Sequence, residues 1–323
     1  MQKKAYAAFC LDKNIRNKSS SGGIFYPLAK GIIKNNGVVF GAMFGKDWKI
    51  VHGYAETLKD IEAFLGSKYV QSNIGNMFIK AKEFLESGRT VLFSGTPCQI
   101  YGLKSYLRKE YRNLYTIDLI CHGVSSPKIW SDYLKEQSKE KVISKINFRD
   151  KTTGWRNFSV NINFSDDSVY RKSHLEETYF KGFMEDIYLR PSCYECKFKG
   201  IDRISDITLS DFWGVEKVKL PDFFVREAEK GISAVIIHSE SGKTMWEMIS
   251  SELQAAEVSV ETIVKYNQNA VLSVKRPKKR KSFFRYNDSS IVKKIERYTK
   301  TTKIKKLKSL VKRVLIKLKI YNK

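Results

Sequence analysis

Apolar residues recur along the chain with two spacings, that of a buried β-strand and that of an amphipathic helix. Short apolar runs predict strands at residues 5–9, 37–44, 48–54, 90–93, 115–120, 142–148, 158–164, 204–214 and 232–238. Helical spacing predicts helices at residues 24–33, 61–65, 74–85, 97–107, 126–134, 176–188 and 244–253. This order predicts an α/β fold, with a mixed and partly parallel sheet flanked by helices and an additional β-rich part after residue 139.

The predicted strands at residues 90–93 and 115–120 should lie parallel, because a helix separates them. Such crossovers are right-handed, so both strands end at the same edge of the sheet. Cys98 follows the first strand and Cys121 ends the second. Open α/β sheets bind ligands at this carboxyl edge, which makes Cys98 and Cys121 candidate site residues.

Cys98 lies in the first turn of a predicted helix. Thr96 and Gln99 have the spacing of a capping box, and Pro97 suits the first helical position. The unpaired N–H groups and the helix dipole favour a thiolate there, the form that binds metal or attacks an electrophile. The alternative, from this pattern alone, is a small buried cysteine that packs as an apolar side chain.

Two polar segments are candidate ligand-binding loops. The segment Ser20-Ser21-Gly22-Gly23 precedes a predicted helix, so its N–H groups and hydroxyls can face an anion such as phosphate. A capped, flexible loop is the alternative interpretation. Residues 67–72 offer a second dense set of polar groups, or else form an exposed loop. These groups belong to Ser67, Lys68, Tyr69, Gln71 and Ser72.

Cys193 and Cys196 form a Cys-Xaa-Xaa-Cys pair, which makes four thiols together with Cys98 and Cys121. Four cysteines are what a [4Fe–4S] cluster or a Cys₄ zinc site requires, and a close pair alone can act as a redox dithiol. The spacing does not separate these sites. It favours zinc, because it lacks the compact arrangement of a ferredoxin.

Two further motifs have a structural and a functional interpretation. Trp155, next to Arg149 and Arg156, can stack on a planar anion or anchor its loop, and the loop anchor is favoured. Asp206 and Asp211 can act as exposed carboxylates or cap turns, and the capping role is favoured.

The formal charge of +25 is concentrated at the C-terminus. Residues 275–323 hold 20 Lys and Arg against Asp288 and Glu296, which leaves only +7 for the first 274 residues. We therefore expect no nucleic-acid partner for the body of the protein. Apolar residues from Ile304 to Leu318 fall on one helical face among cations. Such a basic amphipathic helix suits an anionic membrane surface, an acidic partner or a nucleic-acid backbone, or it is simply solvated.

Cysteine usage and hydropathy indicate the compartment. No apolar run reaches the roughly 20 residues that cross a bilayer, and the first residues form no apolar signal segment. We expect a reducing, cytoplasmic location with free or metal-bound thiols, and attachment to the inner face of the membrane only through the tail.

Seven segments together resemble the coenzyme F420 hydrogenase/dehydrogenase beta-subunit family. Their matches run in order from about residue 5 to about residue 266. The segments are Ser20-Ser21-Gly22-Gly23, Gly66-Ser67-Lys68-Tyr69-Val70-Gln71-Ser72, Gly95-Thr96-Pro97-Cys98-Gln99, Cys121-His122-Gly123, Arg149-Asp150, Cys193-Tyr194-Glu195-Cys196 and Ser210-Asp211-Phe212-Trp213-Gly214.

The resemblance implies FAD and a [4Fe–4S] cluster, with electron transfer between them. It makes Cys98, Cys121, Cys193 and Cys196 the cluster ligands, which reverses the preference for zinc. It implies FAD contacts from both polar segments and from the end of one strand. These contacts are Ser20, Ser21, Gly22, Gly23, Ser67, Lys68, Tyr69, Gln71, Ser72, Ser94, Gly95 and Thr96.

The chain resembles a short form of the family, because the N-terminal ferredoxin-like segment of many relatives is missing. A separate, ferredoxin-like protein should therefore donate the electrons. The acceptor is an organic molecule, F420 or another. Short relatives often occur in bacterial surface-polysaccharide gene clusters, which suggests such a pathway.

These observations give two hypotheses. In the first, residues 1–274 form a flavin and iron–sulfur oxidoreductase domain, and residues 275–323 form a basic tail with an amphipathic helix. In the second, the protein is a non-redox, zinc-stabilised binding module that docks on a membrane surface or an acidic partner through this tail.

Overall fold

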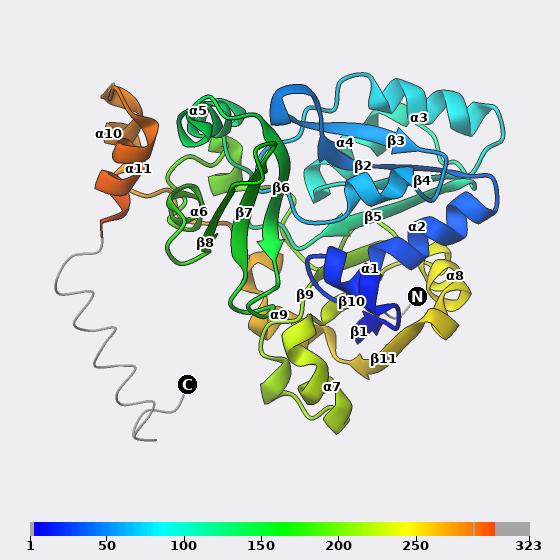
Figure 1. The fold of residues 1–323 in the computed structure, drawn as a ribbon. Coiled ribbons are helices and arrows are strands. Elements are labelled where there is room, and N and C mark those ends of the chain that lie inside the picture. Colours follow the sequence, from blue (N-terminus) through cyan, green and yellow to red (C-terminus); the bar gives the residue numbers. More distant parts are fainter. Residues whose placement is uncertain (1–2, 287, 301–323) are drawn as a thin grey trace.

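The computed structural model describes residues 3–286 and 288–300, which form two β-sheets with helices around them (Figure 1). The larger sheet has the strand order β11 (Leu253–Val258), β1 (Lys4–Cys10), β10 (Ser233–Ile237), β9 (Ile207–Asp211), β5 (Leu114–Leu119), β4 (Val91–Ser94), β2 (Val38–Phe44) and β3 (Ile50–Ala55). The smaller sheet has the order β6 (Ile143–Asp150), β7 (Ser159–Phe164) and β8 (Val169–Ser173). The predicted α/β fold, with a mixed sheet and an additional β-rich part, is confirmed.

The centre of the larger sheet is parallel. Strands β2, β4, β5 and β9 are parallel neighbours, which confirms the predicted parallel pair. The outer strands are antiparallel, and the β2–β3 pair is the expected hairpin. The first strand, β1, lies between β10 and β11 from the last third of the chain. The carboxyl ends of β4, β5 and β9 therefore share one edge, where a ligand can reach all three.

Eleven α-helices are described. They are α1 (Lys13–Lys18), α2 (Phe25–Lys34), α3 (Met77–Glu86), α4 (Pro97–Leu107), α5 (Pro127–Ser138), α6 (Thr178–Met184), α7 (Asp222–Glu227), α8 (Glu240–Met248), α9 (Val260–Tyr266), α10 (Arg280–Arg285) and α11 (Ile291–Thr299). Among the described residues, none of the helices is long and apolar enough to cross a membrane.

Helices cover both faces of the larger sheet, because its central strands are apolar on both sides. Val39 and Leu92 pack with residues of α2 and α8, including Leu28 and Met245, in one buried cluster. Their neighbours in sequence point the other way and pack with α3 and α4. This second cluster includes Val38, Phe40, Phe93, Leu85 and Leu103. Near-continuous apolar strands with helices on both sides are typical of a parallel sheet.

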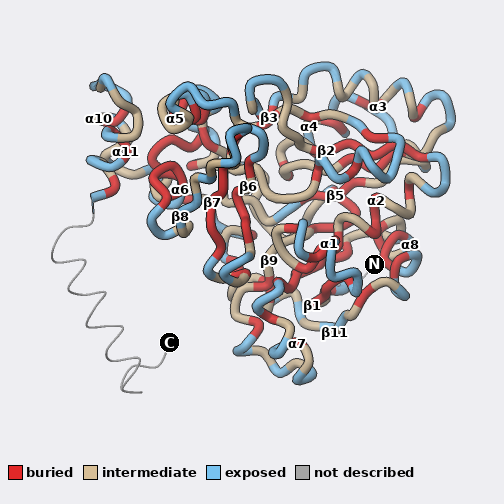
Figure 2. Tube along the Cα trace, in the orientation of Figure 1, coloured by how far each residue is buried: buried red, intermediate tan, exposed pale blue. Residues whose placement is uncertain are grey.

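The smaller sheet has its own core, shared with α5, α6, α10 and α11. Figure 2 shows the buried residues along β6 and β7. Phe283 of α10 and Ile295 of α11 are fully buried in the same cluster as Phe148 and Tyr188. The described part of the basic segment is thus packed against the body. The predicted amphipathic helix from Ile304 to Leu318 lies outside the described residues.

A buried polar clamp joins the two sheets. Arg149 at the end of β6 pairs with Asp211 at the end of β9, with N–O distances of 3.1 and 3.2 Å. Trp155 is completely buried, stacks on Trp213 and donates its indole N–H to Asp211. Trp155 therefore anchors its loop, as the favoured interpretation predicts. Arg156 forms ion pairs with glutamates instead of facing a ligand.

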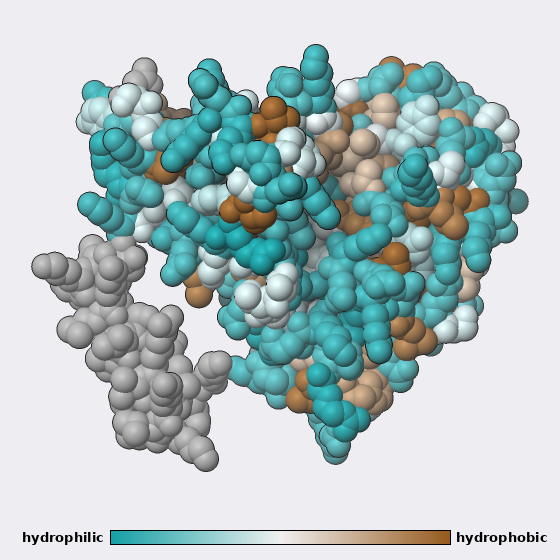
Figure 3. All heavy atoms as spheres, in the orientation of Figure 1, coloured by the Kyte–Doolittle hydropathy of each residue, from teal (hydrophilic) through white to brown (hydrophobic). Residues whose placement is uncertain are grey.

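The face shown in Figure 3 is mostly hydrophilic, with small apolar patches scattered over it. Such isolated apolar side chains are normal on a protein surface. This face therefore indicates no large apolar interface.

Candidate functional site

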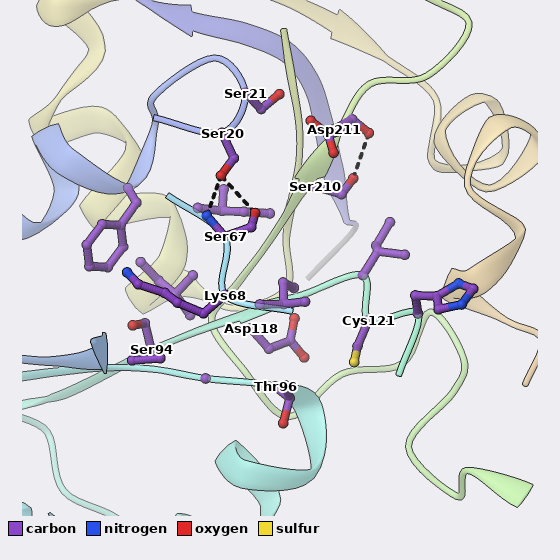
Figure 4. A pocket seen from close by; sticks show the side chains of 18 of the residues that line it. Ser20, Ser21, Ser67, Lys68, Ser94, Thr96, Asp118, Cys121, Ser210 and Asp211 are labelled. Atoms are coloured by element: carbon purple, nitrogen blue, oxygen red, sulfur yellow. Dashed lines mark hydrogen bonds between the residues drawn. The ribbon is translucent and has the colours of Figure 1, made fainter. Parts of the chain in front are cut away.

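A cavity of about 800 Å³ opens at the carboxyl edge of β4, β5 and β9 (Figure 4). Its walls come from the loop before α2, the segment after residue 63, the three strand ends and residues 265–269 after α9. Ten of the twelve expected cofactor contacts line it. They are Ser20, Ser21, Gly23, Ser67, Lys68, Tyr69, Ser72, Ser94, Gly95 and Thr96.

Gly22 and Gln71 are not among the lining residues. A Cβ at Gly22 would lie 2.4 Å from the carbonyl oxygen of Ala8 and 2.8 Å from the amide nitrogen of Ser233. Gly22 thus allows the loop to pack closely against the β1–β10 pair. The amide nitrogen of Gln71 donates to the Ser125 carbonyl, 3.1 Å away, and fixes the second polar segment to the body.

The two polar segments meet at Ser20. Its hydroxyl oxygen accepts hydrogen bonds from the amide nitrogen and the hydroxyl of Ser67, at 2.6 and 2.7 Å, as Figure 4 shows. Helix α2 follows this loop, and no side chain caps its N-terminus at Ile24. The first N–H groups of α2 and the surrounding hydroxyls therefore form a wall suited to an anion.

Lys68 brings a positive charge to the same wall. Its ammonium donates to the carbonyl oxygens of Ala63 and Leu65, both 3.0 Å away, and no ion pair to a carboxylate is found for it among the described residues. Burial lowers the pKa of Lys68 to about 7. An anionic ligand group would compensate this buried charge, so Lys68 is suited to bind one.

His52, on β3, also lines the cavity. Its Nε2 is 3.1 Å from the Ser94 carbonyl oxygen, while its buried Nδ1 has no partner among the described residues. Burial lowers the pKa of His52 to about 4, so the ring is neutral. The sequence analysis missed His52. Its only signal was a histidine within an otherwise apolar strand pattern.

The start of α4 has the expected capping box. The amide nitrogen of Thr96 donates to the Gln99 side chain at 2.9 Å, and Gln99 in turn donates to Ser72 at 2.8 Å. This link joins the second polar segment to α4. The Cys98 sulfur lies 3.1 Å from the Thr96 hydroxyl, just beyond the cavity lining.

Asp118 on β5 is a second residue that the sequence analysis missed. Its carboxylate lines the cavity, is 2% exposed, accepts a hydrogen bond from Thr208 and lies 3.4 Å from Arg203. Burial raises the pKa of Asp118 to about 6, although Arg203 opposes the shift. A carboxylic acid with this pKa can exchange a proton with a ligand near neutral pH.

The contacts described for the other two carboxylates do not show the favoured turn-capping role. Asp206 is buried, not exposed, and accepts hydrogen bonds from the backbone and side chain of Thr116 at 2.7 and 2.6 Å. Asp211 belongs to the clamp with Arg149. The Asp211 carboxylate outweighs the effect of burial and raises the pKa of Arg149.

Cys121 lies two residues after the end of β5 and faces the cavity (Figure 4). Burial raises the pKa of Cys121 to about 12, Lys199 opposes this, and Cys98, Cys193 and Cys196 add to it. A Cβ built on Gly123, two residues further on, would lie 3.7 Å from the Cys193 sulfur. The Cys-Xaa-Xaa-Cys loop thus lies beside the two cysteines at the sheet edge. Cys10 is buried in a different cluster.

The four cysteines do not form a compact site for a single ion. Within the described residues, no three His, Cys, Asp or Glu side chains form a group that could hold one metal ion. A zinc ion would need its thiolates within about 4 Å of one another, given Zn–S bonds of about 2.3 Å. The described geometry therefore gives a Cys₄ zinc site no support.

His122 supports the rim next to Cys121. Its Nε2 lies 2.6 Å from Asp186 and its Nδ1 lies 3.1 Å from the Asn269 side chain. The histidine is thus held between the segment after α6 and the segment after α9, and it lines the cavity, whereas a loop histidine is usually solvated.

Fold and site define an α/β protein with a ligand cavity at the carboxyl edge of its parallel strands and four cysteines next to that cavity. Residues 88–264 match the family model for the C terminus of the beta subunit of coenzyme F420 hydrogenase/dehydrogenase. This match covers more than half of the 323 residues. The chain therefore belongs to this family of redox proteins, and the resemblance of its motifs is confirmed.

Among solved structures, a chain of the F420-reducing [NiFe] hydrogenase complex from Methanosarcina barkeri, studied with xenon, has a similar fold. The TM-score is 0.56, the sequence identity is 19%, and the match covers 83% of this chain and 88% of that chain. At this identity the likeness concerns the fold alone. No curated protein sequence matches the chain.

Proposed function

We propose that this protein is a flavin and iron–sulfur oxidoreductase. It would accept electrons from a separate protein at a [4Fe–4S] cluster on Cys98, Cys121, Cys193 and Cys196 and pass them to FAD and then to an organic acceptor. One observation carries the proposal: ten expected FAD contacts and Cys121 line a single cavity, with the other cysteines beside it.

The cavity fits a dinucleotide cofactor in size and chemistry. Its volume of about 800 Å³ lies within the usual range of cofactor pockets. One wall offers Lys68, serine hydroxyls and the open N-terminus of α2, which suit a diphosphate. Bound FAD would supply hydride and single-electron chemistry, while the protein binds and orients it.

Asp118, another residue of the cavity lining, would handle the proton. Asp118 lines the cavity with a pKa raised by burial, and the hydroxyl of Thr208 donates to its carboxylate. We assign Asp118 the role of holding a proton for the reaction. His52, neutral and hydrogen-bonded to Ser94, would shape the cavity without adding charge.

The cysteine arrangement supports a cluster more than a zinc ion. In a [4Fe–4S] cluster each thiolate binds a different iron, so the sulfurs lie further apart than around one ion. The four cysteines are neighbours, but in the described part of the chain no three of them form a group that could hold one metal ion. Such spacing suits a cluster with several irons. Lys199 would then offset the thiolate charge at Cys121.

Anaerobic purification tests the proposal directly. The protein should show flavin and iron–sulfur absorbance, release FAD on denaturation and contain about four iron and four labile sulfide per chain. Cys98→Ser should lose the iron–sulfur absorbance, whereas Cys10→Ser, at a buried cysteine elsewhere, should keep it. A colourless protein with stoichiometric zinc would contradict the proposal.

A further inference from the structure

The surface around the Cys-Xaa-Xaa-Cys loop combines exposed apolar side chains with a surplus of cations. Cys193 and Cys196 are only partly buried, so the loop lies close to solvent. Next to it lies an apolar centre, which we define as Tyr101, Phe198, Val271 and Leu272. Tyr101 is 49% and Leu272 is 58% exposed.

These residues come from three segments that are in contact. The Tyr101 ring on α4 lies 5.2 Å from that of Phe198, which follows the loop. The Cys196 amide nitrogen donates to the Ser273 hydroxyl, 3.1 Å away, which places Leu272 beside the loop. Lys104 of α4 donates to the carbonyl oxygen of Ile204 at 2.6 Å. The three segments that carry the apolar centre are therefore neighbours at the loop.

Five exposed cations lie on the segments that carry this centre or flank the loop. We call them the cationic collar, and they are Lys104, Arg190, Lys197, Lys275 and Arg276. The amide nitrogen of Cys193 donates to the Arg190 carbonyl at 2.9 Å, and Arg276 lies 3.8 Å from Glu195. Glu195 is the acidic residue in the loop itself, so the collar keeps a clear positive charge.

We propose that the cationic collar and its apolar centre are the docking site for an acidic, one-electron carrier protein. This inference rests on the proposed function, because it needs a redox centre at the cysteines. Redox partners form small, transient interfaces, in which an apolar contact permits close approach and opposite charges speed the encounter. The collar residues lie on the segments next to Cys193 and Cys196, the cysteines nearest to solvent, and Cys121 continues from them to the cavity.

The positive charge of the cationic collar indicates what kind of partner binds there. A basic collar repels a second copy of this chain, whose collar carries the same charge, and it attracts an acidic protein. A membrane would need a broad, flat apolar and cationic face. Here the apolar centre is a small patch around a loop, which suits a small globular carrier.

The test uses the full chain and an acidic plant-type [2Fe–2S] ferredoxin as the probe. Calorimetry measures its binding in oxidised form, and stopped-flow absorbance measures electron transfer from its reduced form. Lys104→Glu/Lys197→Glu should weaken binding and slow transfer at low salt by about tenfold or more. Higher salt should weaken binding to the unmodified protein and reduce this difference. Lys217→Glu/Lys219→Glu, two exposed charge reversals near α7, is the matched control and should bind normally.

The outcomes separate this inference from the proposed function. Dithionite needs no docking, so it should reduce the variant and the unmodified protein equally fast. The inference is overturned if the collar variant binds ferredoxin as tightly as the control does, or if the unmodified protein binds none. It is also overturned if the charge reversals change the oligomeric state instead. A protein without flavin or iron refutes the proposed function, while the calorimetric result still decides whether the collar binds an acidic protein.

Discussion

Single residues at the cavity wall combine unusual burial with incomplete pairing. Lys68 is the clearest case, because its ammonium contacts two carbonyl oxygens and no ion pair is found for it in the described part of the chain. Lys68 was expected from the sequence as a ligand contact, because it lies in a dense polar segment. The sequence could not indicate that its pKa falls to about 7, since this shift is caused by burial among residues from other segments.

The pKa of Lys68 predicts how FAD binding depends on pH. The free lysine loses its proton above pH 7, whereas a bound diphosphate stabilises the charged form and raises the pKa again. Binding therefore takes up a proton above pH 7, and the affinity should fall as the pH rises, by up to about tenfold per pH unit.

Calorimetry of FAD binding to the apoprotein, in two buffers with different ionisation enthalpies, measures this proton uptake. Lys68→Met should bind more weakly at pH 6.5 and show no proton uptake at pH 8. Lys59→Met, at an exposed lysine outside the cavity lining, should behave like the unmodified protein. Equal proton uptake in both variants would exclude Lys68 as the source.

Replacing Gly22 or Gly66 by alanine should lower the free energy of unfolding for two different reasons. Gly22→Ala would press a Cβ against backbone atoms of Ala8 and Ser233, so we expect a loss of about 1–3 kcal/mol or more in the free energy of unfolding. Gly66→Ala meets no atom within 4 Å but keeps a φ of +80°, which costs about 1–2 kcal/mol. Urea unfolding measures both. A smaller loss for Gly22→Ala than for Gly66→Ala would show that the loop can move away from β1 and β10.

At the scale of elements, the sequence predicted most of the sheet because its central strands are short apolar runs. Two edge strands lack this signal and were not predicted. Strand β8 is largely exposed, and β11 alternates between half-buried and exposed residues after Leu253, so neither forms an apolar run. The helix predicted at residues 176–188 ends earlier, at Met184, because Asp186 adopts a left-handed φ of 58°.

Helix α11 predicts that part of the basic C-terminal segment stabilises the fold. Ile295 is fully buried against the core of the smaller sheet, so Ile295→Ala should lower the free energy of unfolding by about 2–5 kcal/mol. Lys293→Ala, at an exposed position of the same helix, should change it by less than about 0.5 kcal/mol. Thermal or urea unfolding checks this. Similar stabilities of both variants would mean that α11 contributes little to the core.

At the scale of the whole molecule, the site depends on how the two sheets meet. The sequence placed Cys98 and Cys121 at one edge through the crossover rule, which uses only local order. The sequence could not predict that Cys193 lies beside this edge or that Asp118 contacts Arg203, because these contacts join residues that are far apart along the chain. The contact of Arg149 with Asp211 could not be predicted for the same reason.

The Arg149–Asp211 clamp predicts a large cost when one partner is removed. Arg149 is buried, and Arg149→Met would leave the Asp211 carboxylate without its cation, which costs about 3–5 kcal/mol. Arg156→Met removes two partly exposed ion pairs and should cost about 1 kcal/mol or less. Unfolding curves followed by tryptophan fluorescence report on the contact between the two sheets, because Trp155 and Trp213 stack there. An equal loss in both variants would argue against the clamp.

The position of β1 between β10 and β11 has a consequence for biosynthesis. While the ribosome makes the chain, β1 emerges long before its partners β10 and β11, which follow it by more than 200 residues. The nascent strand must therefore wait, with its backbone groups unsatisfied by the sheet, until most of the polypeptide has left the exit tunnel. The sheet can therefore be completed only after β10 and β11 have emerged, and chaperones have a long window in which to bind β1.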